Sequence, residues 1–251
     1  MKALVTGAAA GLGKSITNGL ADSGYTVIAL DRDEDGLDQI TGPSIQGLLC
    51  DLSDVNGLES RMDELAGLGP YSLVILNAGI SATGKFENIP AQVHQNLLAV
   101  NTVAPMILAS GLAARNAYSP AARLVFVSSL ACKTGYPGAA SYAASKNAIA
   151  IYAKSIRKPF RKRGVSIMTV FPGPIRTGHA AYHAPSDSDE KNRMHPDEMA
   201  AKIIRATEAG KRHYYPGMAA KLSAMAGSVA PGYTTGLMRK LLYEKLSEEK
   251  W

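Results

Sequence analysis

The sequence predicts an α/β fold, a doubly wound parallel sheet of about seven strands with helices on both faces and a C-terminal helical extension. Three observations support this prediction. Short aliphatic and β-branched runs recur along the 251-residue chain, helical stretches alternate with them, and the connections are long enough for right-handed crossovers. Such alternation is typical of repeated β–α–β units.

Seven runs have the length and composition of buried strands. They span residues 2–6, 25–30, 45–50, 73–77, 123–128, 165–171 and 213–215. The stretches 88–115 and 140–163 are long enough for crossover helices. Pro159 lies inside the second stretch. We expect the helix to kink or stop there, because proline removes a backbone donor and clashes with the preceding turn.

Two later segments interrupt the alternation. Residues 178–196 are polar and predict a mobile loop that leads to a helix starting near Pro196. Residues 218–251 predict two helices divided by Pro231 and Gly232, and apolar residues line one face of the second: Leu237, Met238, Leu241, Leu242 and Leu246. We expect residues 1–217 to form a single domain. The extension is expected to pack on it, to cover a site entrance or subunit interface, or to lie on a membrane surface.

Composition indicates an ordinary globular protein, since 46% of the residues are hydrophobic and 19% are charged. The longest apolar stretch, 97–109, is interrupted by Asn101 and Thr102, so we expect no integral membrane segment. The chain enters its first strand without a secretory signal, and Cys50 and Cys132 have neither disulfide-scaffold nor zinc-site spacing. Both observations favour a cytoplasmic location.

Basic residues give the chain a formal charge of +6 and are densest between positions 154 and 163. This patch has helical spacing near a predicted helix end, where cations complement the helix dipole and reach water. A surface for nucleic acid or anionic lipid is the other interpretation. We expect no nucleic-acid partner.

A glycine-rich turn follows the first strand and contains Thr6, Gly7, Gly11, Leu12 and Gly13. Glycines let the backbone turn sharply and approach a pyrophosphate, whose charge is met by free N–H groups and the positive end of the following helix. A tight turn without a ligand is the alternative. Asp31 ends the next strand, 18 residues after Gly13, and favours a dinucleotide site because its carboxylate can accept hydrogen bonds from a ribose.

Asp31 also predicts which cofactor binds. A 2′-phosphate near its carboxylate would meet like-charge repulsion of a few kcal/mol, so we expect NAD to be preferred over NADP by roughly a hundredfold. Arg32 keeps NADP possible, because its guanidinium can stack on adenine or reach a 2′-phosphate.

Further motifs follow in an order and spacing that resemble the short-chain dehydrogenase/reductase family over about residues 2–217. They are Asn77, Ala78 and Gly79 after the fourth strand, Ser129 after the fifth, and Tyr142 and Lys146 with the spacing Tyr-x-x-x-Lys. The resemblance implies a Rossmann-like fold and a reaction between a nicotinamide cofactor and a secondary alcohol or ketone. It also implies a homodimer or homotetramer.

The resemblance assigns roles by position. Catalytic roles fall to Ser129, Tyr142, Lys146 and Asn101. Cofactor contacts fall to the glycine-rich turn, Asp31, Arg32, Asn77, Ala78, Gly79, Tyr142, Lys146, Asp51, Leu52, Pro172, Gly173, Ile175 and Thr177. The polar loop at 178–196 is expected to contact the substrate, a small alcohol or carbonyl compound.

The residues themselves suggest how the chemistry works. Tyr142 and Lys146 share one helix face, which brings the ammonium near the phenol. Lowering a phenol pKa from about 10 to about 7 needs roughly 4 kcal/mol of preferential stabilisation of the phenolate. We expect Lys146 and the positive nicotinamide ring to supply it, Ser129 to hydrogen-bond the substrate oxygen, and Asn101 to hold a water that links Lys146 to solvent.

Two other functions remain as alternatives. One is an NADPH-dependent carbonyl reductase in which Arg32 overrides Asp31, and the other is a non-catalytic dinucleotide sensor or scaffold. The complete catalytic set argues against the sensor, which has no need for a tuned phenol.

The sequence leaves the role of several other side chains open. His179 and His183 are four residues apart, a spacing shared by metal ligands, substrate-loop residues and solvent-facing residues, and we expect no metal. Four apolar or aromatic residues belong either to a substrate pocket or to the core: Ile80, Tyr136, Phe171 and Tyr182.

Overall fold

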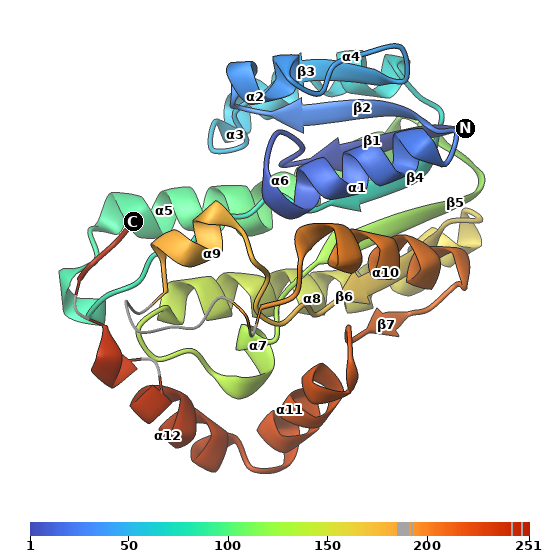
Figure 1. The fold of residues 1–251 in the computed structure, drawn as a ribbon. Helices are drawn as coiled ribbons and strands as arrows, with labels where there is room; N and C mark the ends of the chain where they lie inside the picture. Colours follow the sequence, from blue (N-terminus) through green and yellow to red (C-terminus); the bar gives the residue numbers. More distant parts are fainter. Residues whose placement is uncertain (185–190, 192, 242, 247) are drawn as a thin grey trace.

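A parallel seven-stranded sheet with the strand order β3-β2-β1-β4-β5-β6-β7 forms the centre of the molecule in the computed structural model (Figure 1). The structure describes residues 1–184, 191, 193–241, 243–246 and 248–251. The strands are β1 (Lys2–Thr6), β2 (Thr26–Asp31), β3 (Ile45–Leu49), β4 (Tyr71–Leu76), β5 (Tyr118–Val127), β6 (Ser166–Val170) and β7 (His213–Tyr214). All seven predicted strands are confirmed.

Helices cover both faces of the sheet, as predicted for a doubly wound fold. They are α1 (Gly11–Asp22), α2 (Glu34–Asp38), α3 (Val55–Ser60), α4 (Met62–Gly67), α5 (Ala91–Leu98), α6 (Ala104–Ala114), α7 (Ala131–Thr134), α8 (Ala140–Lys162), α9 (Gly178–Tyr182), α10 (Pro196–Glu208), α11 (Met218–Val229) and α12 (Pro231–Leu241). A 3₁₀ turn spans Phe86–Asn88, and another spans Tyr243–Lys245.

Two hydrophobic clusters lie on the two sides of the sheet. One joins the strands to α4, α6 and α8 through side chains such as Met62, Leu112 and Ile149. The other joins them to α1 and α10 through side chains such as Ile16 and Ile203. Because strand residues point alternately to opposite faces, a strand buried on both faces reads as a continuous apolar run, which is why the strands were recognisable from sequence.

Helix α8 runs through Pro159. Of the kink or stop that we expected at this proline, the stop does not occur, since α8 continues to Lys162. The next residue, Phe160, is buried, and its ring packs edge-on against Tyr118 at a centroid distance of 5.7 Å. This packing holds the last helical turn in place and compensates for the hydrogen bond that proline cannot donate.

One helical run in the described residues, Ala91–Ala114, is long and apolar enough to cross a membrane by length and composition, but half of its most apolar window is buried. It comprises α5, a π-helical turn at Ala99–Val103, and α6. The turn carries Asn101, which is 1% exposed. The run is therefore a core helix of this fold.

The C-terminal extension forms two helices, α11 and α12, and Pro231 opens the second. The helices lie at the end of the molecule farthest from β3, beyond α7 (Figure 1). The Thr235 hydroxyl donates a hydrogen bond to the Thr134 carbonyl at the end of α7. Of the apolar face predicted for α12, Leu237 is exposed and Leu246 is half-buried, whereas Leu242 lies outside the described residues.

Candidate active site

The site lies where the strand order reverses, between β1 and β4. The chain leaves these neighbouring strands toward opposite faces of the sheet, so the loops at their carboxyl ends diverge. In open α/β sheets such a crevice is the usual ligand-binding position. The predicted site residues lie at or after the carboxyl ends of β1 to β6, or on helices that border them.

Close backbone packing shapes the glycine-rich turn between β1 and α1. Gly7 has a φ of +67°, which favours glycine, and a Cβ there would lie 2.8 Å from the Ala78 Cα. A Cβ on Gly13 would overlap the Gly7 carbonyl oxygen and lie 2.7 Å from Asn77 Nδ2. Ala10 caps α1 without a side-chain hydrogen bond, so the first N–H groups of the helix are available to an anion.

Asn77 and Thr6 join the β4 loop to this turn. The Thr6 hydroxyl oxygen accepts hydrogen bonds from the backbone N–H groups of Asn77 and Ala78, at 3.0 and 3.1 Å. Asn77 Nδ2 donates to the carbonyl oxygens of Thr6 and Gly7, at 3.0 and 3.3 Å. These contacts give Asn77 a structural role that a simple strand-end turn would not need.

Asp31 is held in position by three backbone donors. Its Oδ2 accepts from Ala9 N–H at 2.9 Å, and its Oδ1 accepts from the N–H groups of Arg32 and Asp33 at 2.7 and 3.1 Å. A carboxylate oxygen can accept more than one hydrogen bond, so acceptor capacity is left for hydroxyl groups of a ribose. The described part of the chain shows no ion pair between Arg32 and a carboxylate.

The other predicted cofactor residues border the same crevice. Asp51 accepts hydrogen bonds from the backbone and hydroxyl of Ser53, while the next residue, Leu52, is buried in the core. After β6, the Pro172 carbonyl accepts from Leu130 N–H, and Ile175 pairs with Met194. Thr177 caps α9 and lies beside Gly11, where an added Cβ would be 3.1 Å from Thr177 Cγ2. A helix N-terminus without a side-chain cap, a fixed carboxylate and a glycine-lined turn together fit a dinucleotide.

The structure brings Ser129, Tyr142 and Lys146 together. Ser129 follows β5, and its side chain lies close enough to the Tyr142 phenol to influence its pKa. Lys146, one turn further along α8, is 4% exposed, and its Nζ donates to the Val127 carbonyl at 3.0 Å and lies 5.9 Å from the Tyr142 ring centroid. A Cβ on Gly79 would approach Lys146 Nζ to 2.9 Å, so position 79 has no room for a side chain.

Asn101 links this group to the loop after β4. Its amide exchanges two hydrogen bonds with the Ile80 backbone, at 2.8 and 2.9 Å, and donates to Ser145 Oγ at 3.0 Å. The Ser145 hydroxyl in turn donates to the Tyr142 carbonyl at 2.8 Å. Ser145 was not predicted as a site residue. Its position three residues after Tyr142, on the same helix face, could have indicated a role beside it.

Burial controls the electrostatics of the catalytic pair. It raises the pKa of Tyr142 above its ordinary value, and the neighbouring Ser129 side chain opposes this shift. Burial therefore acts against the lowered phenol pKa that we expect with the cofactor bound, because desolvation disfavours the phenolate. Burial also lowers the pKa of Lys146, from 10.5 to about 8. Both shifts favour the uncharged forms of the two side chains.

The lowered pKa of Lys146 predicts how stability depends on pH. The folded state releases this proton at about pH 8 and the unfolded state only near 10.5, so between these values the unfolded chain binds more protons. Stability of the wild type should therefore rise through this window by about 3 kcal/mol relative to Lys146→Met. Urea unfolding at several pH values measures this difference. Lys154→Met on the exposed side of α8 is the control, and a similar pH trend in both comparisons would contradict the assignment.

Residues from distant parts of the chain border the substrate side of Tyr142. The His183 ring lies 4.7 Å from that of His179, and its Nδ1 contacts Thr83 Oγ1 at 3.3 Å. Burial lowers the pKa of His183 to about 4, which keeps the ring neutral. The backbone of Thr83 exchanges two hydrogen bonds with that of Lys250, both 2.8 Å long. The C-terminal segment therefore reaches the mouth of the site.

Other candidate side chains take different places. Phe171 is 2% exposed and stacks on Tyr215 at 4.7 Å, so it belongs to the core, whereas Tyr182 is 54% exposed. No group of three potential metal ligands occurs among the residues that the structure describes. The carboxylates at 187, 189 and 190 lie outside those residues.

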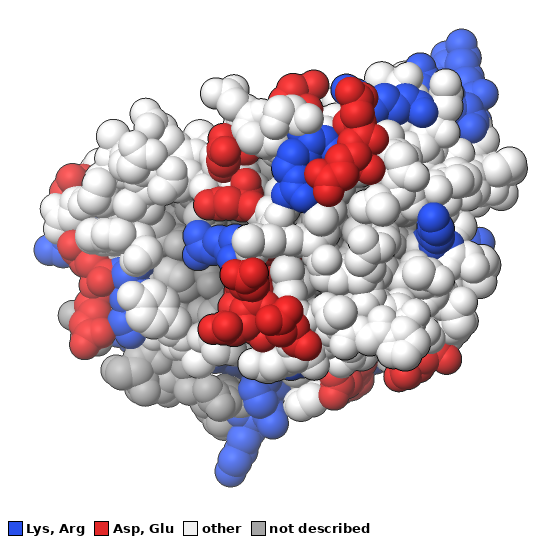
Figure 2. All heavy atoms as spheres, turned by 90° about the horizontal axis from the view of Figure 1, so that it is seen from above, with Lys and Arg blue, Asp and Glu red and all other residues white. Residues whose placement is uncertain are grey.

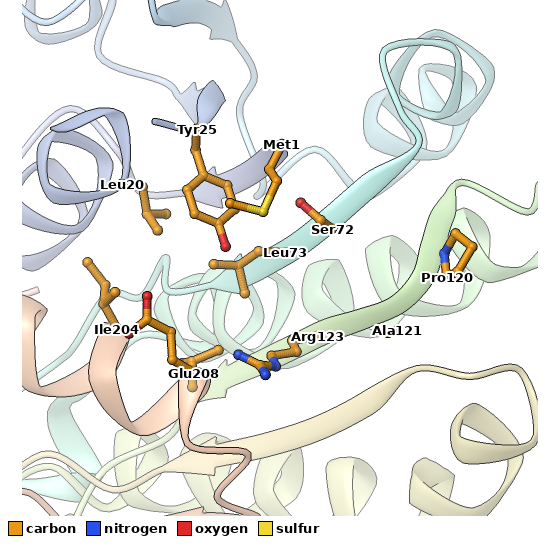
Figure 3. A pocket seen from close by; sticks show the side chains of 11 residues that line it. Met1, Leu20, Tyr25, Ser72, Leu73, Pro120, Ala121, Arg123, Ile204 and Glu208 are labelled. Carbon is orange, nitrogen blue, oxygen red and sulfur yellow. The ribbon is translucent and has the colours of Figure 1, made fainter. Parts of the chain in front are cut away.

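A separate pocket of about 250 Å³ lies at the opposite edge of the sheet (Figure 3). Met1, Tyr25, Leu73, Arg123 and Glu208 are among the residues that line it. Leu73 and Arg123 are paired in register and precede the carboxyl ends of their strands. The pocket is thus distinct from the crevice that holds Tyr142.

Comparison with known proteins gives consistent results. A family model described as short chain dehydrogenase matches residues 1–187. The 3-oxoacyl-[acyl-carrier-protein] reductase FabG of Haemophilus influenzae is 25% identical over 238 residues, covering 93% of each chain. The D-threitol dehydrogenase of Mycolicibacterium smegmatis is 25% identical over 217 residues, covering 80% of this chain and 84% of the relative. A short-chain dehydrogenase structure from Burkholderia cenocepacia in complex with NADP has a TM-score of 0.80 at 21% identity, covering 94% and 96% of the two chains.

Proposed function

Because the chain belongs to the short-chain dehydrogenase family, we propose that it transfers a hydride between NAD and a secondary alcohol or ketone, with Tyr142 as general acid and base. The oxidoreductase class and a nicotinamide cofactor come with the family. The observation that carries the proposal is the convergence of Ser129, Tyr142 and buried Lys146, whose Nζ lies 5.9 Å from the Tyr142 ring centroid.

In the reductive direction, the residues of this chain move one proton. Tyr142 donates its phenol proton to the substrate oxygen as the carbonyl becomes an alkoxide, and Ser129 stabilises the developing charge with a hydrogen bond. When bound, the nicotinamide supplies the hydride for the carbonyl carbon. Lys146 stabilises the resulting phenolate, and oxidation of an alcohol runs through the same steps in reverse.

The Asn101–Ser145 network positions these groups. It ties the start of α8 to the loop after β4, because Ser145 donates to the Tyr142 carbonyl and accepts from Asn101, and Asn101 bonds the Ile80 backbone. Residues whose side chains are locked in this way hold a reacting geometry without reorganisation during the reaction. A water held between Asn101 and Lys146 would then connect the phenolate to solvent.

We assign the preference for NAD to Asp31. Its carboxylate is fixed by three backbone N–H groups and has no cationic partner among the described residues. A 2′-phosphate would therefore face an uncompensated negative charge, whereas ribose hydroxyls would be accepted as donors.

Asp31→Ala should reduce the preference for NADH over NADPH by about 10- to 100-fold, because it removes the like-charge repulsion. Nicotinamide fluorescence on titration with each reduced cofactor measures both dissociation constants. Arg32→Ala is the companion variant and should leave the ratio nearly unchanged. An unaltered ratio in Asp31→Ala would show that another group selects the cofactor.

The second candidate is an NADPH-dependent carbonyl reductase. The exposed Arg32 side chain favours it, since it forms no ion pair with a described carboxylate and can turn toward a 2′-phosphate. Tighter binding of NADPH than NADH, lost in Arg32→Ala, would establish this function instead.

Turnover is tested with a panel of secondary alcohols and ketones in the presence of the tighter cofactor. We propose residues 1–217 as the catalytic unit, acting in the cytoplasm as a homodimer or homotetramer on a small molecule. Binding of a cofactor without turnover of any panel member would favour the sensor or scaffold alternative.

A further inference from the structure

Helix α11 faces the protein with small residues and solvent with large ones. Ala220, Ala224 and Gly227 are its buried residues. Met218, Leu222, Met225 and Val229 are 70%, 55%, 62% and 80% exposed. At 100° per residue these four lie within about 60° of one another, on the opposite side from the buried three. Helices that only complete a protein core have the reverse arrangement.

Helix α12 extends this exposed surface. Tyr233 and Leu237 follow Val229 at intervals of four residues and are 76% and 44% exposed, while Thr234 is the buried residue between them. We call Met218, Leu222, Met225, Val229, Tyr233 and Leu237 the outer stripe. Exposed apolar residues gathered on neighbouring helices in this way usually mark a contact with a partner or a membrane.

The segment that carries the outer stripe is basic. Residues 209–243 contain no Asp or Glu, and their cations are Lys211, Arg212, Lys221, Arg239 and Lys240. All five are exposed, and among the described residues the one ion pair they form joins Arg239 to Glu244, at 3.6 Å. The opposite end of the molecule differs, since acidic and basic side chains lie side by side there (Figure 2).

We propose that the outer stripe binds the surface of an anionic lipid bilayer, with α11 and α12 lying along the headgroup region. The apolar side chains would enter the boundary of the acyl chains while the flanking cations contact lipid phosphates. A second copy of this chain fits less well, because a symmetric contact would oppose two surfaces of the same positive sign. This inference does not depend on the reaction proposed for Tyr142.

The test is sedimentation of the full-length protein with vesicles of phosphatidylcholine, alone or mixed with phosphatidylglycerol. We expect at least about tenfold tighter binding to the mixed vesicles, weakened by added NaCl because the cations act through screened attraction. Met225→Glu should reduce binding to the mixed vesicles by at least about tenfold, because it places a charge in the apolar contact.

Ser223→Glu is the matched control. It adds the same charge at an exposed position of the same helix, outside the outer stripe, and should change binding by at most about threefold. Circular dichroism and cofactor titration confirm that both variants are folded. Two outcomes would overturn the proposal: equal losses of vesicle binding in the two variants, or wild-type protein that does not bind the mixed vesicles.

Sedimentation velocity without lipid tests the alternative that the outer stripe binds a second copy of this chain. If Met225→Glu dissociates an oligomer of the wild-type chain, whereas Ser223→Glu does not, and neither binds vesicles, then the outer stripe is a contact between copies. That result would replace the lipid proposal with a subunit interface.

Discussion

Tyr142→Phe is expected to lower kcat by about 10³- to 10⁴-fold while changing the dissociation constant of the reduced cofactor by no more than about threefold. The variant keeps the aromatic ring but removes the phenol hydroxyl that lies beside Ser129. Without it, the proton must come from water, which is neither positioned nor tuned for the transfer. Steady-state rates and nicotinamide fluorescence separate chemistry from binding.

Tyr136→Phe is the control for this experiment. The Tyr136 phenol is also buried and lies close enough to Tyr142 to raise its pKa. Removing this hydroxyl should lower kcat by less than about tenfold, because Tyr136 transfers no proton in the proposed reaction. Near wild-type activity in Tyr142→Phe, or equal losses in both variants, would remove Tyr142 from the role of acid and base.

Gly13→Ala should weaken cofactor binding by more than about a hundredfold and lower the free energy of unfolding by several kcal/mol. The added Cβ would overlap the Gly7 carbonyl and crowd Asn77, so α1 must move away from the turn. The N–H groups at the start of α1 would then leave the position in which they meet a pyrophosphate. Urea unfolding and cofactor titration measure the two effects.

Gly19→Ala provides the comparison within the same helix. Its Cβ would meet only the tip of Ile204, at 3.2 Å, and alanine favours the helix over glycine by about 1 kcal/mol. We therefore expect almost unchanged stability and binding. If Gly13→Ala bound the cofactor as well as Gly19→Ala does, the close packing of the turn would have no part in the site.

The fold was predictable because its signals are local. Each strand has its own apolar run, and the carboxyl ends of parallel strands meet at one edge, so the sequence was enough to group Asp31, Asn77 and Ser129. The continuation of α8 past Pro159 was not predictable, because the compensating contact of Phe160 with Tyr118 joins residues far apart in the chain. The burial that raises the pKa of Tyr142 was not predictable either, because desolvation depends on the surrounding packing, which residue spacing does not describe.

The orientation of α11 shows a second limit. An amphipathic helix ordinarily turns its large apolar residues inward. The helix instead packs through Ala220, Ala224 and Gly227, because small residues allow it to approach α7 closely. A sequence pattern identifies the two faces of a helix but not which of them the rest of the chain will cover.

The pairing of Thr83 with Lys250 has a consequence for the order of assembly during synthesis. The sheet can begin to form while the C-terminal segment is still inside the ribosome, since β1, β2 and β4 all precede Thr83 in the chain. At ordinary rates of translation, Lys250 follows Thr83 on the order of ten seconds later. The contact at Thr83 therefore forms late, only after Lys250 has emerged from the ribosome, and until then the loop after β4 must remain folded without its backbone partner.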